Sequence, residues 1–194
     1  AIYWGMGISQ CVHGTDNTLS LANLALLTGH IGQPGTGLNP LRGQNNVQGC
    51  SDSGGLPHVF PGYQRVDDSE IRAKFEADWG TNLNPEVGLT TMEMVDAVDN
   101  GHIRAYYVMG ENPMMSEPDL RHARQVMGKL DFLLVQDIFL NETGEFADII
   151  LPATSFAEKD GTFTNSDRRV QKIRPAVPNP GESRDDWDII SDLA

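Results

Sequence analysis

The sequence predicts an α/β fold, with an open, mostly parallel sheet, flanking helices and long loops rich in Gly, Asn and Gln. Three short apolar segments alternate with amphipathic or loop segments over the second half of the chain. This alternation is typical of parallel sheets, whose strands need crossover connections. With 194 residues, of which 39% are hydrophobic, the chain can bury a sizeable core.

The predicted strands of this sheet are the apolar runs over residues 104–109, 132–136 and 148–151. Strands buried on both faces have such near-continuous apolar runs. Amphipathic spacing predicts helices over residues 68–79, 90–100 and 119–128. The second half of the chain therefore supplies most of the predicted sheet and its helices.

The first residues, 1–6, predict another short buried strand. A helix is expected over residues 17–28, with Thr15 or Asp16 as its N-cap. Because leucine and alanine occur on most sides of this helix, it should be largely buried. Residues 161–165 and 168–173 predict a β-hairpin or an extended segment.

Between the predicted elements lies a long loop over residues 32–63, rich in glycine, proline and side-chain amides. A loop of this length in a compact domain usually has a function or is disordered. Apolar residues spread through it favour order, and an ordered, amide-rich loop should bind a polar group. The domain organisation is predicted as one α/β region over 1–174, a Pro-rich linker over 175–182 and a helix over 183–194, capped by Ser183.

The composition excludes several classes of protein. A net charge of −13 argues against nucleic-acid binding, which needs clustered Lys and Arg. Cys11 and Cys50 form no CxxC pair, and the histidines lack metal-ligand spacing, so no self-contained metal site is expected in this chain. No apolar run is long enough to span a membrane, and no signal peptide is evident.

Polar residues follow each predicted strand of the sheet, among them Asn112, Gln136, Asp137 and Thr154. Ligands of open parallel sheets bind beyond the carboxyl ends of the strands. Amide and carboxylate groups there can hydrogen-bond a purine, and a helix N-terminus can bind a diphosphate. The ordinary alternative is that these residues only form turns.

Arg42 stands in a stretch, residues 29–51, in which His30 is the only other titratable side chain apart from Cys50. A guanidinium group can bind a carboxylate through two parallel hydrogen bonds. The alternative is an arginine that braces the loop by donating to backbone carbonyls. The residues alone leave both interpretations open.

The segments together resemble the molybdopterin oxidoreductase superfamily. Gly5-Met6-Gly7-Ile8-Ser9-Gln10 is similar to its G-M-G-x-x-Q segment, and residues 21–32 are similar to its helix ending in T-G-x-I-G. Short matching motifs then follow in order at residues 109–113, 135–137, 147–152 and 158–165. The resemblance therefore extends over essentially the whole chain.

One motif selects a branch of this superfamily. Asn39-Pro40-Leu41-Arg42-Gly43-Gln44-Asn45-Asn46-Val47-Gln48-Gly49 resembles the formate dehydrogenase form, whereas nitrate reductases tend to have a neutral residue in place of Arg42. The resemblance implies oxidation of formate to carbon dioxide, with Arg42 on the substrate carboxylate and Gln44 supporting the site. It also implies a bis-molybdopterin guanine dinucleotide cofactor with molybdenum or tungsten.

By the same resemblance, a group of residues contacts this cofactor. Met6 and Gln10 would lie beside a pterin. The residues expected at the guanine dinucleotide are Asn112, Ser116, Gln136, Asp137, Lys159 and Asp186. Lys159 would supply a cation to a phosphate or ribose.

The resemblance further implies that this chain is an internal fragment of a catalytic subunit and is inactive alone. The Cys or selenocysteine metal ligand and a [4Fe–4S] cluster would belong to the rest of that subunit. Expected partners are formate, the remaining domains and electron-transfer subunits, with NAD as the first expected acceptor, in the cytoplasm. Two alternatives stay open: a superfamily member acting on nitrate or another oxyanion, and a non-catalytic homologue in a respiratory complex.

Overall fold

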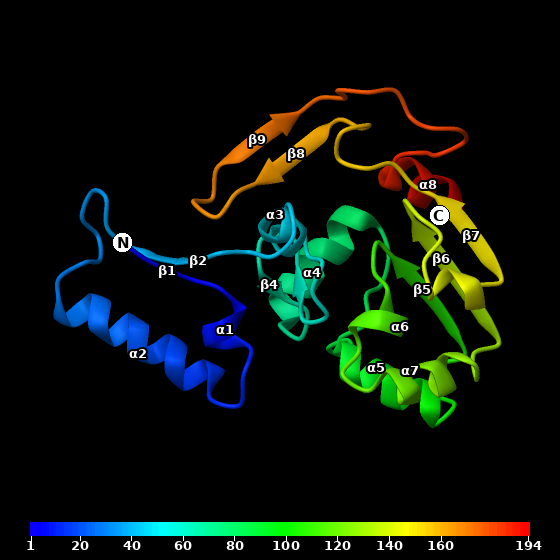
Figure 1. Ribbon diagram of the computed structural model, residues 1–194, viewed down its shortest axis with the longest axis horizontal. Helices are drawn as coiled ribbons and strands as arrows, with labels where there is room; N and C mark the ends of the chain where they lie inside the picture. The colour runs from blue at the N-terminus through cyan, green and yellow to red at the C-terminus, as the bar shows by residue number, and fades with distance from the viewer. The chain divides into compact units, whose positions relative to one another are not determined.

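The three apolar runs in the second half of the chain form one parallel sheet in the computed structural model, which describes residues 1–194 (Figure 1). In sheet order the strands are β5 (Ala105–Met109), β6 (Phe132–Asp137) and β7 (Ile149–Pro152). Both neighbouring pairs run parallel, so the strands end at the same edge. The predicted α/β fold with a parallel sheet is confirmed.

Helices precede, connect and follow these strands. They are α5 (Thr91–Asp99), α6 (Pro113–Ser116), α7 (Leu120–Met127) and α8 (Asp186–Leu193), with a 3₁₀ turn over Gly144–Phe146. At the start of α5, Glu93 accepts hydrogen bonds of 2.7 Å from both the N–H and the hydroxyl of Thr90. The helices predicted over 90–100 and 119–128 are confirmed to within one residue at each end.

The cap predicted for the last helix was wrong. Its N-cap is Asp185, not Ser183. The Ser183 hydroxyl donates to the carbonyl of Pro180 at 2.8 Å, so it completes a turn before the helix and does not reach the helix amides. Residues 175–182 form no helix or strand. The larger division into a region over 1–174, a linker and a final helix stays a prediction.

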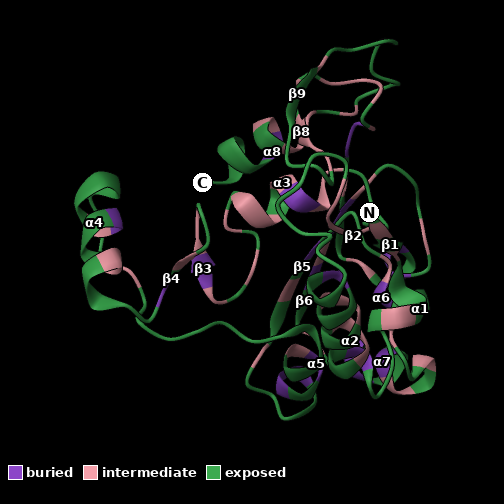
Figure 2. Ribbon diagram, turned by 90° about the vertical axis from the view of Figure 1, so that its left-hand side faces the viewer, coloured by how far each residue is buried: buried purple, intermediate pink, exposed green.

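The core beneath this sheet is made by β-branched and aliphatic residues of helices and strands. Val98 of α5 and Val126 of α7 pack together, with Tyr106 of β5 against them. On the strands, Val108 and Val135 are buried side by side with Leu133. Buried residues therefore gather where α5 and α7 meet β5 and β6 (Figure 2).

The chain forms two compact units. Residues 1–85 and 162–172 make up unit 1, and residues 86–161 and 173–194 make up unit 2, which contains the parallel sheet. The chain therefore crosses between the units more than once, and each unit is described by itself.

Unit 1 begins with one long helix and three short elements. Its first elements are β1 (Ile2–Trp4), α1 (Met6–Ser9), α2 (Gly14–Leu27) and β2 (Leu38–Pro40). The strand predicted over 1–6 is shorter than expected, because Met6 already begins α1. The helix α2 is confirmed, but its N-cap is His13 rather than Thr15 or Asp16.

The prediction that α2 is largely buried was wrong. Gly14 and Ala25 are its buried residues, whereas Leu19, Leu24, Leu26 and Leu27 are all at least half exposed. Within unit 1 this helix packs against the short elements α1 and β2. These are too small to cover a helix that is apolar on most sides.

The predicted loop over residues 32–63 contains more structure than expected. It includes β2, α3 (Val47–Asp52) and β3 (Val59–Phe60), and β3 pairs antiparallel with β4 (Gln64–Arg65). The elements are too short to leave a clear periodicity in the sequence. The following helix, α4 (Ser69–Trp79), is confirmed, with Asp68 accepting from two N–H groups at its start.

The segments predicted as a hairpin or extended chain are confirmed as paired strands. They are β8 (Gly161–Thr164) and β9 (Val170–Ile173), which form a two-stranded sheet. Asn165 closes the connection, because its side-chain oxygen accepts from the N–H of Arg169 at 2.9 Å. The turn of the strand pair belongs to unit 1. It lies near the loop that contains Arg42, which we call the arginine loop.

Candidate functional site

Unit 1 contains a cavity of about 230 Å³ lined by the loop around Arg42 and by the β8–β9 turn. Side chains that line it include Arg42, Gln44, Asn46, Gln48, Phe163 and Asn165. Arg42 is the one charged residue among all those that line this cavity. The predicted pair Arg42 and Gln44 therefore lies at the same cavity, which is polar, small and positively charged.

Arg42 is held by a glutamine and not by a carboxylate. Its guanidinium donates to Oε1 of Gln48 at 3.3 Å. The amide nitrogen of Gln48 donates in turn to Asp52 at 2.9 Å. Gln48 thus lies between the guanidinium of Arg42 and the carboxylate of Asp52. The positive charge of Arg42 therefore stays available to a ligand in the cavity.

Asn46 joins the arginine loop to β8. It has left-handed backbone angles (φ 60°) at the start of α3, and its side-chain oxygen accepts from the N–H of Thr164 at 2.9 Å. A Cβ atom at Gly49 would lie 2.1 Å from this oxygen, so a larger residue there would displace the Asn46 side chain. The two walls of the cavity are therefore held together by a hydrogen bond that a larger residue at Gly49 would disturb.

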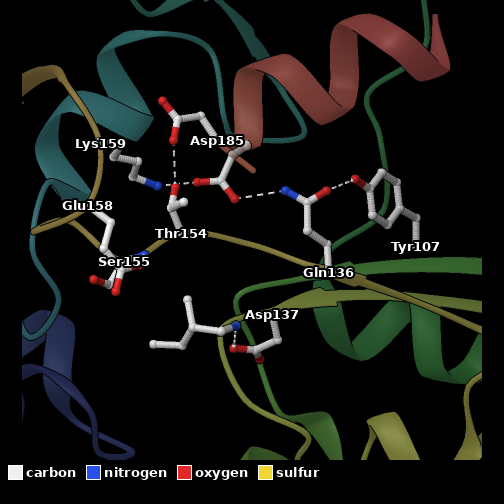
Figure 3. Close-up of polar contacts among 10 residues, drawn as sticks. Tyr107, Gln136, Asp137, Thr154, Ser155, Glu158, Lys159 and Asp185 are labelled. Atoms are coloured by element: carbon white, nitrogen blue, oxygen red, sulfur yellow. Dashed lines mark hydrogen bonds and ion pairs between the residues drawn. The ribbon is translucent and has the colours of Figure 1, made fainter. Parts of the chain in front are cut away.

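In unit 2, three of the predicted cofactor residues come together near the edge where the strands end: Gln136, Lys159 and Asp186. Figure 3 labels Gln136 and Lys159 and marks their contacts with dashed lines. Gln136 lies at the end of β6 and is fully buried. Its amide nitrogen donates to Asp186 at 2.7 Å, and the other carboxylate oxygen of Asp186 accepts from Lys159. Residues that are far apart in the sequence thus form one polar network.

A fourth member of the network, Tyr107, was not predicted from the sequence. Its hydroxyl donates to Oε1 of Gln136, from the neighbouring strand β5. Burial raises the pKa of Tyr107, and the negative charge of Asp186 raises it further, so the hydroxyl stays protonated and remains a donor. The only signal was a hydroxyl in an otherwise apolar strand, which is common in proteins.

The charges of Lys159 and Asp186 offset each other in part. Their side chains are 21% and 33% exposed, so the pair is neither fully buried nor fully solvated. Next to it lies a cavity of about 410 Å³, lined by Lys159, Asp185 and Trp187 among others. Of the network, Lys159 lines this cavity, together with the carboxylates of Glu158, Asp160, Asp185 and Asp188.

Other predicted residues of this edge are occupied by contacts within the protein. The Asn112 amide nitrogen donates to Glu142 at 2.7 Å, and its oxygen accepts from the Thr143 hydroxyl at 2.7 Å. The Asn112 donation is the main cause that lowers the pKa of Glu142. Asp137 accepts from the N–H of Ile138 at 2.6 Å and from Asn141 at 2.8 Å. These contacts match the turn-forming role that was the alternative to ligand binding.

The remaining predicted residues lie at the ends of short helices. Ser116 is exposed at the end of α6, where its N–H donates to the Asn112 carbonyl at 3.0 Å. Met6 and Gln10 are exposed at the two ends of α1 in unit 1. The structure does not bring these three residues into either of the two polar clusters.

No group of three or more His, Cys, Asp or Glu side chains is arranged to hold a metal ion. None of the helices has both the length and the apolar character that crossing a membrane requires.

Solved structures include one with a similar fold. Acetylene hydratase from Pelobacter acetylenicus superposes with a TM-score of 0.51 and 19% sequence identity, over 56% of this chain and 16% of that one. At this identity the likeness concerns the fold alone.

Sequence comparison connects the chain to much closer relatives. The F420-dependent formate dehydrogenase subunit alpha of Methanocaldococcus jannaschii is 56% identical over 194 residues. The F420-dependent formate dehydrogenase 1 subunit alpha of Methanococcus maripaludis is 52% identical over 194 residues. In each case the match covers 100% of this chain and 28% of the relative. The profile of the molybdopterin oxidoreductase family matches residues 1–194, and the chain therefore belongs to this family.

Proposed function

We propose that this chain is the part of a longer formate dehydrogenase catalytic subunit that binds the substrate carboxylate and the nucleotide part of a molybdopterin cofactor. The observation that carries the proposal is Arg42, which faces a small polar cavity with no carboxylate among the residues that line it. The names of the relatives that are 56% and 52% identical support formate as the substrate.

The role of Arg42 follows from its chemistry. Formate is a small anion, and the guanidinium donates to both carboxylate oxygens at once. This contact orients the formate C–H bond, whose cleavage yields carbon dioxide, one proton and two electrons. Gln44 lines the same cavity and offers an amide for a further hydrogen bond. The protein thus contributes positioning and charge, and the bound cofactor supplies the redox chemistry.

The donors and acceptors at the strand edge of unit 2 fit a guanine dinucleotide. Asp186 is an acceptor-only group that can pair with the N–H groups of a guanine edge, and it is one-third exposed. Lys159 supplies a cation for a phosphate or a ribose hydroxyl. The buried amide of Gln136 orients Asp186 by donating a hydrogen bond to its carboxylate. We therefore propose Gln136, Lys159 and Asp186 as the main residues of this site, and Asn112, Asp137 and Ser116 as further contacts of the nucleotide.

Other features of the whole protein come with this proposal. Met6 and Gln10 would lie beside a pterin of the bis-molybdopterin guanine dinucleotide. A [4Fe–4S] cluster, the molybdenum or tungsten ligand and the electron-transfer partners would lie outside this chain. The names of the two relatives favour F420 over NAD as the electron acceptor. We propose the cytoplasm as the location.

The test is formate-dependent dye reduction by the full-length protein, comparing the wild type with Arg42→Ala. A lost hydrogen bond to a charged group costs about 1.5–3 kcal/mol, so kcat/KM for formate should fall by about 10- to 100-fold. The matched control is Arg65→Ala, because Arg65 is an exposed arginine of the same unit that already pairs with Asp67 at 2.6 Å.

A change of less than about threefold in Arg42→Ala would disprove the role of Arg42, since even one charged hydrogen bond is worth more. Wild-type protein that is inactive with formate but reduces nitrate would support a different substrate in the same cavity. Loss of activity in Arg65→Ala as well would show that the assay reports folding.

A further inference from the structure

Gln48 is one of the few buried polar side chains of the molecule, at 9% exposure. It lies in α3, between a cation and an anion. Its Oε1 accepts from Arg42 at 3.3 Å, and its Nε2 donates to Asp52 at 2.9 Å. Both ends of this amide are therefore engaged with charged groups.

These two neighbours leave the amide of Gln48 one orientation. An ionised carboxylate only accepts hydrogen bonds, so Asp52 must receive the NH₂ end. A guanidinium only donates, so Arg42 must receive the oxygen. Turning the amide by 180° would place donor against donor and acceptor against acceptor, which both neighbours oppose.

We propose that Gln48 is a positioning residue for formate binding: it anchors Arg42 through a neutral oxygen and so leaves the positive charge of the guanidinium uncompensated. This inference rests on the proposed role of Arg42. A glutamate of the same size at position 48 could anchor Arg42 as well, but a carboxylate would pair with the guanidinium and compete with the substrate anion.

The structure of α3 supports this separation of charge. Gln48 and Asp52 are four residues apart on one face of the helix, so the amide fills the space between Asp52 and the arginine. Asp52 makes no ion pair with Arg42. The carboxylate thus orients the amide without neutralising the cation that the amide holds.

Unit 1 contains a similar glutamine that serves as a control. Gln64 accepts from Lys74 at 3.0 Å and donates to the carbonyl of Pro61 at 2.7 Å. It is also partly buried, but it does not line the Arg42 cavity. Gln64→Glu therefore adds the same charge to the same unit without touching the proposed substrate site.

The experiment measures formate KM and kcat in the full-length, cofactor-loaded enzyme for the wild type, Gln48→Glu and Gln64→Glu. Gln48→Glu should raise the KM for formate at least about tenfold, because it opposes a charged contact that both ground and transition states use. Its kcat per bound cofactor should stay within about threefold of wild type, because the interaction lost is uniform binding. Gln64→Glu should leave both constants within about twofold, as expected for a change remote from the cavity.

A second readout does not need turnover. The guanidinium reagent phenylglyoxal is applied to each protein, and the modification of Arg42 is followed by peptide mass spectrometry. In the wild type, formate should slow this modification. In Gln48→Glu the reaction should be slow already without formate, and formate should change it little, because the introduced carboxylate occupies the guanidinium.

Asp52→Asn provides a second variant in case Gln48→Glu does not fold. An asparagine can donate as well as accept, so the amide of Gln48 is no longer held in one orientation. The KM for formate should then rise by about threefold or more, the size of a weakened hydrogen bond. Gln64→Glu should show neither the rise in the KM for formate nor the slower modification of Arg42.

A KM within twofold of wild type in both Gln48→Glu and Asp52→Asn would overturn the proposal. So would a loss of kcat with unchanged KM, which indicates structural damage rather than competition at Arg42. If Arg42→Ala impairs formate oxidation but these variants do not, only the role of Gln48 fails. If Arg42→Ala has no effect, the proposed function itself fails.

Discussion

Arg42 in unit 1 and Lys159 in unit 2 are two cations at predicted sites, and their surroundings differ in one respect. Arg42 contacts a neutral amide oxygen, whereas Lys159 pairs directly with the carboxylate of Asp186. An uncompensated guanidinium attracts an anion. A lysine paired with a carboxylate instead holds that carboxylate in place as an acceptor. This difference supports the proposal that the first site binds a negatively charged group and the second binds hydrogen-bond donors.

A buried glutamine lies at the centre of each site. Gln48 donates to Asp52 and accepts from a cation, while Gln136 donates to Asp186 and accepts from the neutral hydroxyl of Tyr107. Buried amides cost free energy unless both ends are satisfied. Both ends of each amide form a hydrogen bond here, so each glutamine has a defined orientation. Each glutamine in turn orients the charged residue that it contacts.

The largest effect is expected for Arg42→Lys, which sharpens the comparison by making the two cations alike. A lysine keeps the charge but loses the planar fork that binds two oxygens. The kcat/KM for formate should fall by about tenfold or more, since at least one charged hydrogen bond is lost. Steady-state kinetics of the full-length enzyme measure this, with Arg65→Lys as the control. Activity equal to wild type would show that charge alone suffices.

A smaller effect is expected for Lys159→Met, which removes the cation from the second site. Asp186 would keep its contact to Gln136 but lose its ion pair, so its carboxylate is less well placed for a guanine edge. The guanine nucleotide released per mole of denatured full-length protein should fall by about threefold, a modest value because the pair is partly solvated.

Lys129→Met is the matched control for this experiment. Lys129 forms an ion pair with Asp99 at 2.7 Å in the same unit, away from the strand edge. Its guanine content should equal that of the wild type. An equal loss in both variants would contradict a specific role for Lys159.

Tyr107→Phe tests the contact between the second network and the neighbouring strand β5. It removes the hydrogen bond to Gln136 and keeps the ring, so a neutral bond worth about 1 kcal/mol is lost. Guanine retention should fall by about twofold, and Tyr3→Phe, at an exposed tyrosine of unit 1, should have no effect. A normal guanine content in Tyr107→Phe would mean that Asp186 alone orients Gln136.

The smallest effect concerns the capping of α5, remote from both sites. Hydrogen bonds from Thr90 lower the pKa of Glu93, so the charged form is favoured in the folded state. The resulting stabilisation is present above the ordinary glutamate pKa and is lost as the pH falls through the lowered value. Hydrogen exchange at the α5 amides should therefore become faster on acidification in the wild type, relative to Glu93→Ala. An identical pH profile in both proteins would exclude this contribution.

Much of the fold was predictable because long periodic segments have one favourable environment. The strands over 104–109, 132–136 and 148–151 and the helices after Asp68, Thr90 and Asp119 all form within one residue of the expected bounds. The short elements inside residues 32–63 were missed, because two- to six-residue segments are stabilised by tertiary contacts and not by their own pattern.

The candidate site was likewise predictable only in part. An isolated arginine among amides and the polar residues at strand ends were visible in the sequence, because charge and residue type do not depend on folding. The partners of those residues were not visible: Gln48 lies between Arg42 and Asp52, Tyr107 donates to Gln136, and Asp186 pairs with Lys159.

The sequence by itself determined the α/β class, the order of the main elements and the positions of the residues that we propose to bind an anion or a nucleotide. Only the tertiary structure decided which of these residues share a network and which charge stays uncompensated. The physical reason is that hydrogen bonds and ion pairs depend on distances of a few ångströms between groups up to 118 residues apart, and only packing of the whole chain sets those distances.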